Sequence, residues 1–442
     1  MGTPIDPPHA YPADLARFVL ERLRAEGGGE GGPLGCADLS LPALDRLLST
    51  AYQATLLREE ERAVTFRLIL GPPEAFPAEG GPPKGLHRLE LTGPRPFTEH
   101  ELRRLAPAVP FSRALIGIRR AGAGDFAIWG MLQSGPLWLR SAIGGRGVPS
   151  LLPRPALVVR ASGPGRLEVA RGNGMLGELR GGRLAGPSLD VFASRWLAAR
   201  FSDARRELAE LHEAAALRAG TPWAPLDPDL TRRISQQMVK RLIATMLAAR
   251  HGGTVILLPP ELAGAVLDED RFVRLKYRFA DAEPRRRYRS LILSLLRALA
   301  QTTPPEAGPV GWGAYELTRS AEVAALDEAV FEVSRLCASF ADVDGAVVMT
   351  KRFELLGFGG EILGGPGDLP TVRRALDLEG DSYEVEPVDG VGTRHRSAYR
   401  LCQQIHDAVV LVVSHDAGAR FVAWHHGAVT YWDHVPTGAR EG

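Results

Sequence analysis

Two short stretches near the C-terminus carry the side chains best suited to chemistry on a phosphorylated substrate. The first gathers a hydroxyl, two guanidiniums and an imidazole after a glycine, in the order Gly392, Thr393, Arg394, His395 and Arg396. Because forked guanidiniums match the geometry of phosphate oxygens, we expect this stretch to bind phosphate groups. Residues 397–405 are predicted to form a helix, whose N-terminal amides and dipole would strengthen the phosphate site.

The second stretch lies earlier in the chain and consists of Asp344, Gly345 and Ala346. It follows the helical pattern of residues 326–340 and leads into an apolar run that predicts a buried strand. A carboxylate at the start of such a strand can hold a divalent metal ion. The two stretches together therefore predict a site for a metal and a phosphate.

Both stretches, in this order, resemble the D-G-A and G-T-R-H-R motifs of the diadenylate cyclase domain. The resemblance continues through residues 407–414, which are similar to the strand after the R-H-R helix. It then extends to the sequence Ser-His-Asp-Ala-Gly at residues 414–418, which is similar to the family's S-E-E-T-G. The resemblance covers roughly residues 228–442 and includes a large insertion at residues 261–325.

This resemblance implies that the domain condenses two ATP molecules into cyclic di-AMP and two pyrophosphates. It implies that Asp344 and Asp416 bind Mg²⁺ or Mn²⁺, and that Asp344 helps to deprotonate the attacking 3'-hydroxyl. The other implied catalytic residues are Arg394, His395 and Arg396. The implied nucleotide-binding residues are Gly345, Ala346, Gly392, Thr393 and Ser414. Because one site holds one ATP, a homodimer or higher oligomer is expected.

Departures from the family pattern leave a second interpretation open. Val343 stands where a histidine often precedes the aspartate, and His415 and Asp416 replace two glutamates. Residues 357–360 lack the usual L-P-L, which leaves the base selectivity open. The domain is therefore either an active cyclase or a catalytically silent nucleotide-binding receptor.

Length and composition limit the number of domains and the kinds of partner. A chain of 442 residues predicts two or three domains, and a net charge of +1 provides no global attraction for nucleic acid or anionic membranes. No apolar run approaches the length of a transmembrane helix, and the N-terminus lacks a signal sequence. The separated Cys36, Cys337 and Cys402 are typical of buried thiols in a reducing compartment. We expect a cytoplasmic protein that binds neither membrane nor nucleic acid.

The patterns of helices and strands predict two α/β domains. Residues 1–219 form an α/β sensor domain, residues 220–228 form a linker rich in proline, and residues 229–442 form the cyclase-like domain, with a mixed sheet flanked by helices. The first domain resembles the sensor region called DACNV, on the basis of residues 51–62, 97–105 and 186–192. It carries no catalytic motif, so the ligand that it senses stays unknown.

Segments of the first domain recur in the same order in the second. Residues 110–132 parallel residues 344–357, and residues 156–184 parallel residues 408–429. Between them, residues 142–147 stand where the arginine-rich stretch would be and keep only Arg146 of it. The first domain is either a degenerate copy of the second or shares with it only common strand-turn-strand segments, and a shared strand order would distinguish the two.

Basic and aromatic residues are interleaved in residues 271–289, where the aromatic ones are Phe272, Tyr277, Phe279 and Tyr288. This composition would suit a clamp for single-stranded nucleic acid or a nucleotide. It would also suit a strand followed by the start of a helix, with the aromatic side chains in the core. We prefer the second interpretation.

Overall fold

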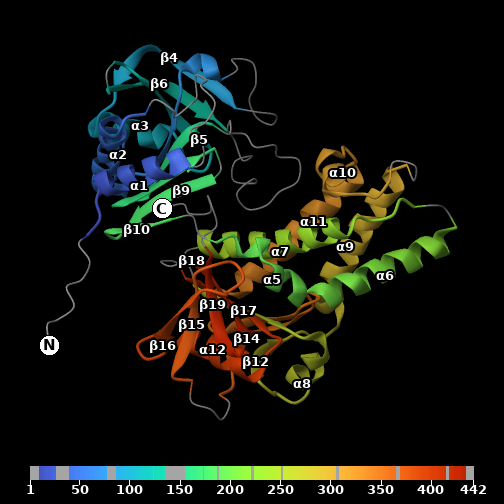
Figure 1. Ribbon diagram of the computed structural model, residues 1–442. Helices are drawn as coiled ribbons and strands as arrows, with labels where there is room; N and C mark the ends of the chain where they lie inside the picture. The colour runs from blue at the N-terminus through green and yellow to red at the C-terminus, as the bar shows by residue number, and fades with distance from the viewer. Residues whose placement is uncertain are drawn as a thin grey trace, which may run out of the picture. The chain divides into compact units, whose positions relative to one another are not determined.

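The computed structural model describes residues 9–25, 39–76, 86–122, 124–134, 155–172, 174–186, 189–220, 223–249, 252–304, 308–364, 369–414 and 418–434. Described residues up to 186 form one compact unit, and those from 189 to 434 form a second. Each unit contains helices and one large mixed sheet, as Figure 1 shows. The predicted α/β class is therefore confirmed.

The first unit is built on a sheet in which eight described strands follow the order β10-β9-β8-β7-β3-β5-β6-β4. Neighbouring strands are antiparallel except for the parallel pair β3 and β5. The strands are β3 (Phe66–Leu70), β4 (His87–Pro96), β5 (Ala114–Arg120), β6 (Phe126–Gln133), β7 (Leu157–Gly163), β8 (Arg166–Arg171), β9 (Gly174–Arg180) and β10 (Arg183–Ala185). A separate ribbon pairs β1 (Arg58–Glu59) with β2 (Arg62–Ala63).

Three helices accompany this sheet, namely α1 (Pro12–Ala25), α2 (Leu41–Leu56) and α3 (Glu99–Leu105). The hydroxyl of Ser40 accepts a hydrogen bond from the amide of Ala43 and thereby caps the start of α2. Leucines and alanines recur at helical spacing in α1 and α2, and the apolar stripes that they form pack on β7, β8 and β9. Burial of these stripes forms the core of the first unit.

The second unit is built on a sheet of nine described strands in the order β12-β14-β13-β11-β17-β18-β19-β15-β16. The parallel pairs are β11 with β13 and β15 with β19. The strands are β11 (Gly253–Leu258), β12 (Val273–Arg278), β13 (Ala346–Thr350), β14 (Leu355–Ile362), β15 (Thr371–Ala375), β16 (Tyr383–Pro387), β17 (Val409–Ser414), β18 (Gly418–His425) and β19 (Ala428–His434).

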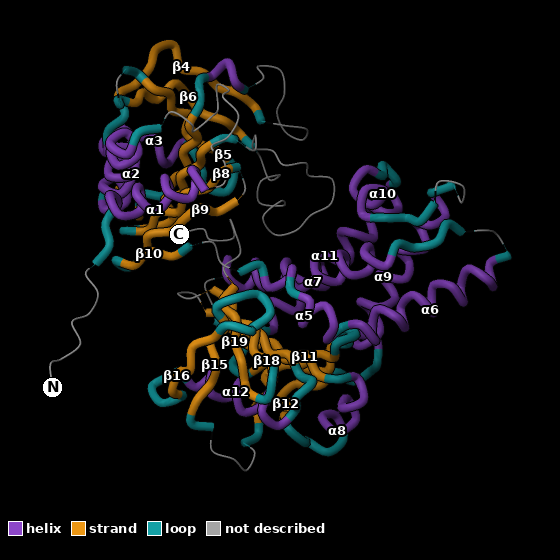
Figure 2. The backbone as a smooth tube through the Cα atoms, in the orientation of Figure 1, coloured by secondary structure: helices purple, strands orange, loops and turns teal. Residues whose placement is uncertain are grey.

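Helices cover both faces of the second sheet (Figure 2). They are α5 (Arg195–Arg200), α6 (Ser202–Ala219), α7 (Pro228–Ala248), α8 (Ala263–Leu267), α9 (Glu283–Thr302), α10 (Trp312–Leu317), α11 (Ala321–Phe340) and α12 (Thr393–Gln404). Val410 and Val412 share a core cluster with α12, whereas Val409 faces a chamber beside α7. Because alternate residues of a strand point to opposite faces, β17 is buried from both sides, as its continuous apolar sequence predicts.

The division between the units falls earlier than the predicted linker at residues 220–228. Residues 189–219, which the sequence assigned to the sensor domain, belong to the second unit. Trp196 of α5 stacks on Trp432 of β19 with ring centroids 4.1 Å apart. Aromatic packing of this kind joins residues distant in sequence, which explains why the composition of the linker did not reveal the boundary.

Two further stretches differ from their sequence-based descriptions. Residues 371–391, for which the sequence analysis predicts no strand, contain the antiparallel strands β15 and β16. Their charges pair across the strands, and Arg374 lies 3.5 Å from Glu384. The predicted insertion at residues 261–325 supplies β12, which pairs with β14 at the edge of the sheet, and so contributes directly to the fold.

Membrane and thiol predictions can be compared with the described residues. Within them, no helix combines the length and the apolar character needed to cross a bilayer. Cys337 and Cys402 are buried and unpaired, which confirms their assignment as buried thiols. Cys36 and Arg146 lie outside the described residues.

Seven strands of the two sheets match in chain order, in direction and in neighbours. Strands β3 to β9 of the first sheet correspond in turn to β11, β12, β13, β14, β17, β18 and β19 of the second. In both sheets the first and third strands of the set are parallel, and the second lies at the edge beside the fourth. This agreement confirms the shared strand order that an internal repeat requires.

Two glycines mark the same position in both sheets. Gly130 of β6 and Gly357 of β14 each adjoin a register shift against the neighbouring strand. A β-carbon on Gly130 would lie 2.1 Å from the backbone oxygen of Leu89, and one on Gly357 would lie 2.4 Å from that of Tyr277. Both oxygens belong to the edge strand. In both sheets a glycine at the same position lets the edge strand approach its neighbour closely. This shared detail favours an internal repeat over a chance similarity of strand-turn-strand segments.

The matching registers also align the first sheet with the predicted metal site. Gly117 of β5 pairs with Gly130, and Val348 of β13 pairs with Gly357, so Gly117 and Val348 occupy equivalent positions. Arg113 comes four residues before Gly117, and Asp344 comes four residues before Val348. Arg113 is therefore equivalent to Asp344. The first sheet therefore carries a cation where the second carries the carboxylate, in agreement with the prediction that the copy lacks the acid.

We predict that Gly130→Ala and Gly357→Ala each lower the free energy of unfolding by about 1–3 kcal/mol, because the added methyl group must displace an edge strand. Urea unfolding would measure this change. Gly93→Ala and Gly364→Ala are matched controls with no atoms near the new methyl group, and they should leave the unfolding midpoint nearly unchanged. Equal midpoints for all four variants would contradict the shared packing.

Candidate functional site

The described residues of the predicted site lie at one end of the central strands of the second sheet, where β11 and β13 begin and β17 ends. Thr254 of β11 lies opposite both Ala346 and Val412. Asp344 and Gly345 come directly before β13, and Ser414 is the last residue of β17. Neighbouring strands are about 4.8 Å apart, so these residues form a short row along the edge.

The guanidinium of Arg394 lies over this row. A β-carbon on Gly252, just before β11, would come 2.7 Å from Nη1 of Arg394 and 3.0 Å from the backbone oxygen of Val413. Gly252 and Asp344 each come two residues before the first paired residues of their strands, Thr254 of β11 and Ala346 of β13. Arg394 therefore lies at the same end of these strands as Asp344. The sequence analysis did not single out Gly252, which makes room for Arg394.

Helix α12 presents the arginine-rich stretch, as the sequence predicts. It begins at Thr393, with Gly392 as the N-cap and no acidic residue in the first turn. Thr393, Arg394 and Arg396 are exposed. Backbone amides in the first turn of a helix lack intrahelical partners and attract anions. The positive end of the helix dipole therefore coincides with the positive charges of Arg394 and Arg396.

His395 is more buried than its neighbours in the stretch. Burial, together with the charges of Arg420 and Arg394, lowers the pKa of its imidazole to about 4, although Asp433 acts in the opposite direction. Its Nε2 is covered and has no hydrogen-bond partner among the described residues. His395 is therefore neutral at pH 7, and the positive charge of the stretch comes from Arg394 and Arg396.

Behind His395, Arg420 and Asp433 form a pair across β18 and β19. Nε of Arg420 donates a hydrogen bond of 2.7 Å to Oδ1 of Asp433, and Nε of Arg374 lies 3.3 Å from Oδ2. The guanidinium of Arg420 also lies 4.3 Å from the ring centre of Tyr431. Both oxygens of Asp433 are engaged by arginines, so this carboxylate is not available to a metal.

Asp344 is the accessible carboxylate of the row. Its side chain is 93% exposed, and its Oδ2 lies 3.9 Å from Nζ of Lys276. Within the described part of the chain, no group of three or more His, Cys, Asp or Glu side chains could hold a metal. Asp416 lies outside the described residues. Mg²⁺ commonly binds one or two carboxylates together with substrate phosphates, and Asp344 beside Arg394 fits such a donor set.

The backbone beside Asp344 is unusually closely packed. Gly345 has a φ of 116°, and a β-carbon there would lie 2.5 Å from the carbonyl carbon of Gly359. Any side chain at residue 345 would be strained and would collide with β14. Residue 345 must be glycine because of its positive φ and because no space is left for a β-carbon. Ala346 follows as the first residue of β13 and is buried.

Four aromatic side chains near this backbone were not included in the predicted site. Phe358 stacks on Phe340 at 4.4 Å and on Tyr277 at 4.7 Å, and Phe279 lies at their edge. Tyr277 is 50% exposed and offers a flat surface to a ligand. Tyr288, by contrast, is buried, as the core interpretation of residues 271–289 predicts. The available signal for Tyr277 was its place in β12, where basic residues alternate with Val273, Leu275 and Tyr277.

Comparison with known families identifies part of the first unit. Residues 40–133 match a probable sensor domain called DACNV. The match runs from the N-cap of α2 to the end of β6. It confirms the predicted DACNV resemblance for this region. Neither a curated protein nor a solved structure matches the chain.

We predict that His395 makes folding stability depend on pH between about 6.5 and 4. An unfolded histidine binds a proton near pH 6.5, whereas His395 in the folded protein resists protonation down to about 4. Its contribution is complete above pH 6.5 and is lost as the pH falls through this window. His395→Gln should flatten the profile of urea midpoint against pH. Parallel profiles for wild type and variant would disprove this role, and the exposed His426→Gln is the control.

Proposed function

We propose that the second unit is a diadenylate cyclase that condenses two ATP molecules into cyclic di-AMP and pyrophosphate, and that the DACNV-containing unit regulates it. The observation that supports this most directly is the position of Arg394 against Gly252, at the start of β11, the strand next to the one that Asp344 precedes. A cationic fork and an accessible carboxylate at the same end of neighbouring strands suit a phosphate and a metal bound near each other.

The residues of α12 would bind the triphosphate. Arg394 and Arg396 supply fixed positive charge, and the first-turn amides together with Thr393 supply hydrogen-bond donors. Neutral His395 adds a hydrogen-bonding nitrogen without a titrating charge near pH 7. Ser414, at the end of β17 beside Gly252, lies within the same row and would contact the phosphates from the sheet side.

Asp344 would prepare the attacking hydroxyl. A bound Mg²⁺ or Mn²⁺ would neutralise phosphate charge and make the 3'-hydroxyl more acidic. Asp344 would orient that ion and accept a hydrogen bond from the hydroxyl, because its side chain is exposed and engages only the distant Nζ of Lys276. Positioning and charge neutralisation account for most of the catalysis in phosphoryl chemistry.

Gly345 lets the backbone beside Asp344 pack directly on Gly359, and Gly359 in turn lies against the side chain of Tyr277, so an aromatic surface lies close to Asp344. Tyr277 and Phe358 provide a stacked aromatic surface on the neighbouring strands. These features suit a purine base, which binds through its faces as well as its edges. The adenine would then lie on β12 and β14 with its phosphates directed towards α12.

A single row of site residues can hold one ATP, whereas the product joins two nucleotides through reciprocal attack. Two copies of the row must therefore face each other when the reaction occurs. Arg113 in place of Asp344 makes the first unit unsuitable as the second half of this arrangement. We therefore infer a homodimer, or a higher oligomer, that forms through the cyclase-like units.

A catalytically silent nucleotide receptor is the second candidate. It is favoured by Val343 beside the aspartate and because, among the residues whose positions are described, no group of three or more His, Cys, Asp or Glu side chains could hold a metal. Such a receptor would use the same arginines to bind ATP and would release no pyrophosphate. Product formation distinguishes the two candidates.

Incubating the full chain with ATP and Mn²⁺ and analysing the products by chromatography tests the proposal. We expect cyclic di-AMP from the wild type and a loss of at least about a hundredfold in Asp344→Asn, because the metal carboxylate is removed. ATP binding should persist in this variant, since the arginines remain. Asp342→Asn, an exposed neighbour, should retain activity. ATP binding by the wild type without product would support the receptor instead.

Gly252→Ala tests the position of Arg394 without altering a charged residue. The new methyl group would occupy the space of Nη1 and should push the guanidinium away from the row. We predict at least about tenfold weaker ATP binding, measured by calorimetry, with a smaller effect for Gly313→Ala, where the methyl group meets no atoms. Unchanged affinity in Gly252→Ala would remove Arg394 from the site.

A further inference from the structure

A groove in the second unit lies apart from the predicted nucleotide site. It is formed by α6 and by the chain that leads into α7, and its volume is about 630 Å³. Small-molecule sites usually fall between about 300 and 1,000 Å³. Its lining includes Arg205, His212, Trp223 and Thr231, none of which belongs to the row beside α12. The groove is therefore large enough for a separate ligand.

Arg205 is a charged residue that lines the groove and also the small spaces beside it. Its side chain is half-buried, and it has no hydrogen-bond or ion-pair partner among the described residues. Burial lowers the pKa of its guanidinium, and the neighbouring Arg232 lowers it further. Arg232 has its own counter-ion, because its Nε donates to Oδ1 of Asp229 at 2.7 Å. One of two adjacent cations thus lacks a compensating anion, an arrangement that costs free energy unless a ligand supplies one.

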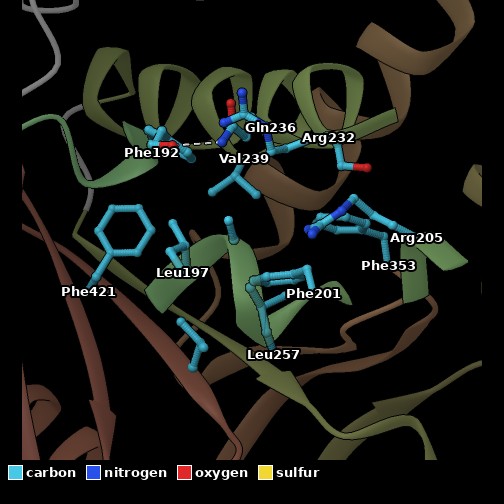
Figure 3. Close-up of a pocket in the computed structure, with 13 residues that line it drawn as sticks. Phe192, Leu197, Phe201, Arg205, Arg232, Gln236, Val239, Leu257, Phe353 and Phe421 are labelled. Atoms are coloured by element: carbon cyan, nitrogen blue, oxygen red, sulfur yellow. Dashed lines mark hydrogen bonds between the residues drawn. The ribbon is translucent and has the colours of Figure 1, made fainter. Parts of the chain in front are cut away.

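Figure 3 shows Arg205 beside Phe353, at the end of an apolar chamber bounded by Phe192, Phe421 and Leu257. That chamber has a volume of only about 30 Å³, which corresponds to a single water molecule. It is therefore too small to hold an organic ligand. Arg205 also lines a third space, of about 30 Å³, so the groove is the one of these three spaces with room for an organic anion bound to it.

The groove offers an apolar wall next to this cation. The rings of Trp223 and His212 lie 5.2 Å apart, and alanines, prolines and two leucines line much of the rest, together with the charged Arg206 and Glu213. Burial lowers the pKa of His212, so its ring is neutral and adds apolar surface instead of charge. Asp227 also borders the groove, but its Oδ1 accepts a hydrogen bond from the amide of Asp229 at the start of α7.

We propose that this groove binds a small organic anion, whose phosphate or carboxylate pairs with Arg205 while its apolar body lies against Trp223. The forked guanidinium suits either anionic group, and the aromatic wall suits a flat body. The ligand would bridge α6 to the start of α7. It would thus act on the helices that pack above the sheet, away from the residues that bind the nucleotide.

Calorimetry on the full chain, without metal or nucleotide, tests this proposal. We expect saturable binding of phenyl phosphate or phenylacetate with one molecule per chain, and the tighter of the two identifies the preferred anionic group. Inorganic phosphate should bind at least about tenfold more weakly because it lacks the apolar body. Equal affinity for inorganic and phenyl phosphate, or no saturable binding of either phenyl compound, would overturn the proposal.

Matched variants locate the site. Arg205→Gln should weaken binding of the preferred phenyl compound at least about tenfold, and Arg205→Lys, which keeps the charge but loses the fork, should weaken it less. Arg218→Gln, on the same helix but outside the groove, should bind like the wild type. Arg394→Gln should also retain binding, because the two sites are separate. Unchanged affinity in Arg205→Gln, or loss of binding in Arg394→Gln, would disprove the assignment.

Discussion

The parallel pairing of β11 with β13 is the constraint on which the candidate site depends. Because the two strands run in the same direction, both begin at one edge of the sheet, and Gly252 and Asp344 each come two residues before the first paired residues of their strands. Antiparallel β17 ends at that edge with Ser414. A slip of one residue between β11 and β13 would turn Asp344 away and bury an apolar neighbour at the wrong face. The hydrophobic cores on both sides of the sheet hold this register in place.

Glycine residues at two positions provide the close packing that the site needs in addition to the strand register. At Gly252 it leaves room for a guanidinium, and at Gly345 it allows both a positive φ and close contact with β14. A side chain at Gly252 would keep the Arg394 guanidinium away from the start of β11, and a side chain at Gly345 would keep the backbone away from Gly359 of β14. The chemistry of the row therefore depends as much on missing β-carbons as on the charged groups that they admit.

Local signals carried most of what the sequence could predict. The helix after the arginine-rich stretch, the buried strand after Asp344 and the shared strand order follow from short patterns of charge, glycine and apolar residues, although α12 begins at Thr393, four residues earlier than predicted. Packing between distant segments was beyond such patterns. The stacking of Trp196 on Trp432, which attaches residues 189–219 to the second sheet, has no counterpart in the linker composition. The strands β15 and β16 were missed because their alternating charges resemble a solvated connection.

The two related sheets carry opposite charges at one equivalent point, Arg113 in the first and Asp344 in the second. A divalent cation is repelled by a guanidinium and attracted by a carboxylate, so under the proposed function the first sheet would not compete with the second for the ion. The shared strand order would then be kept while the charge at this one position differs. The first sheet would be free to bind a different ligand without affecting the metal site proposed for the second.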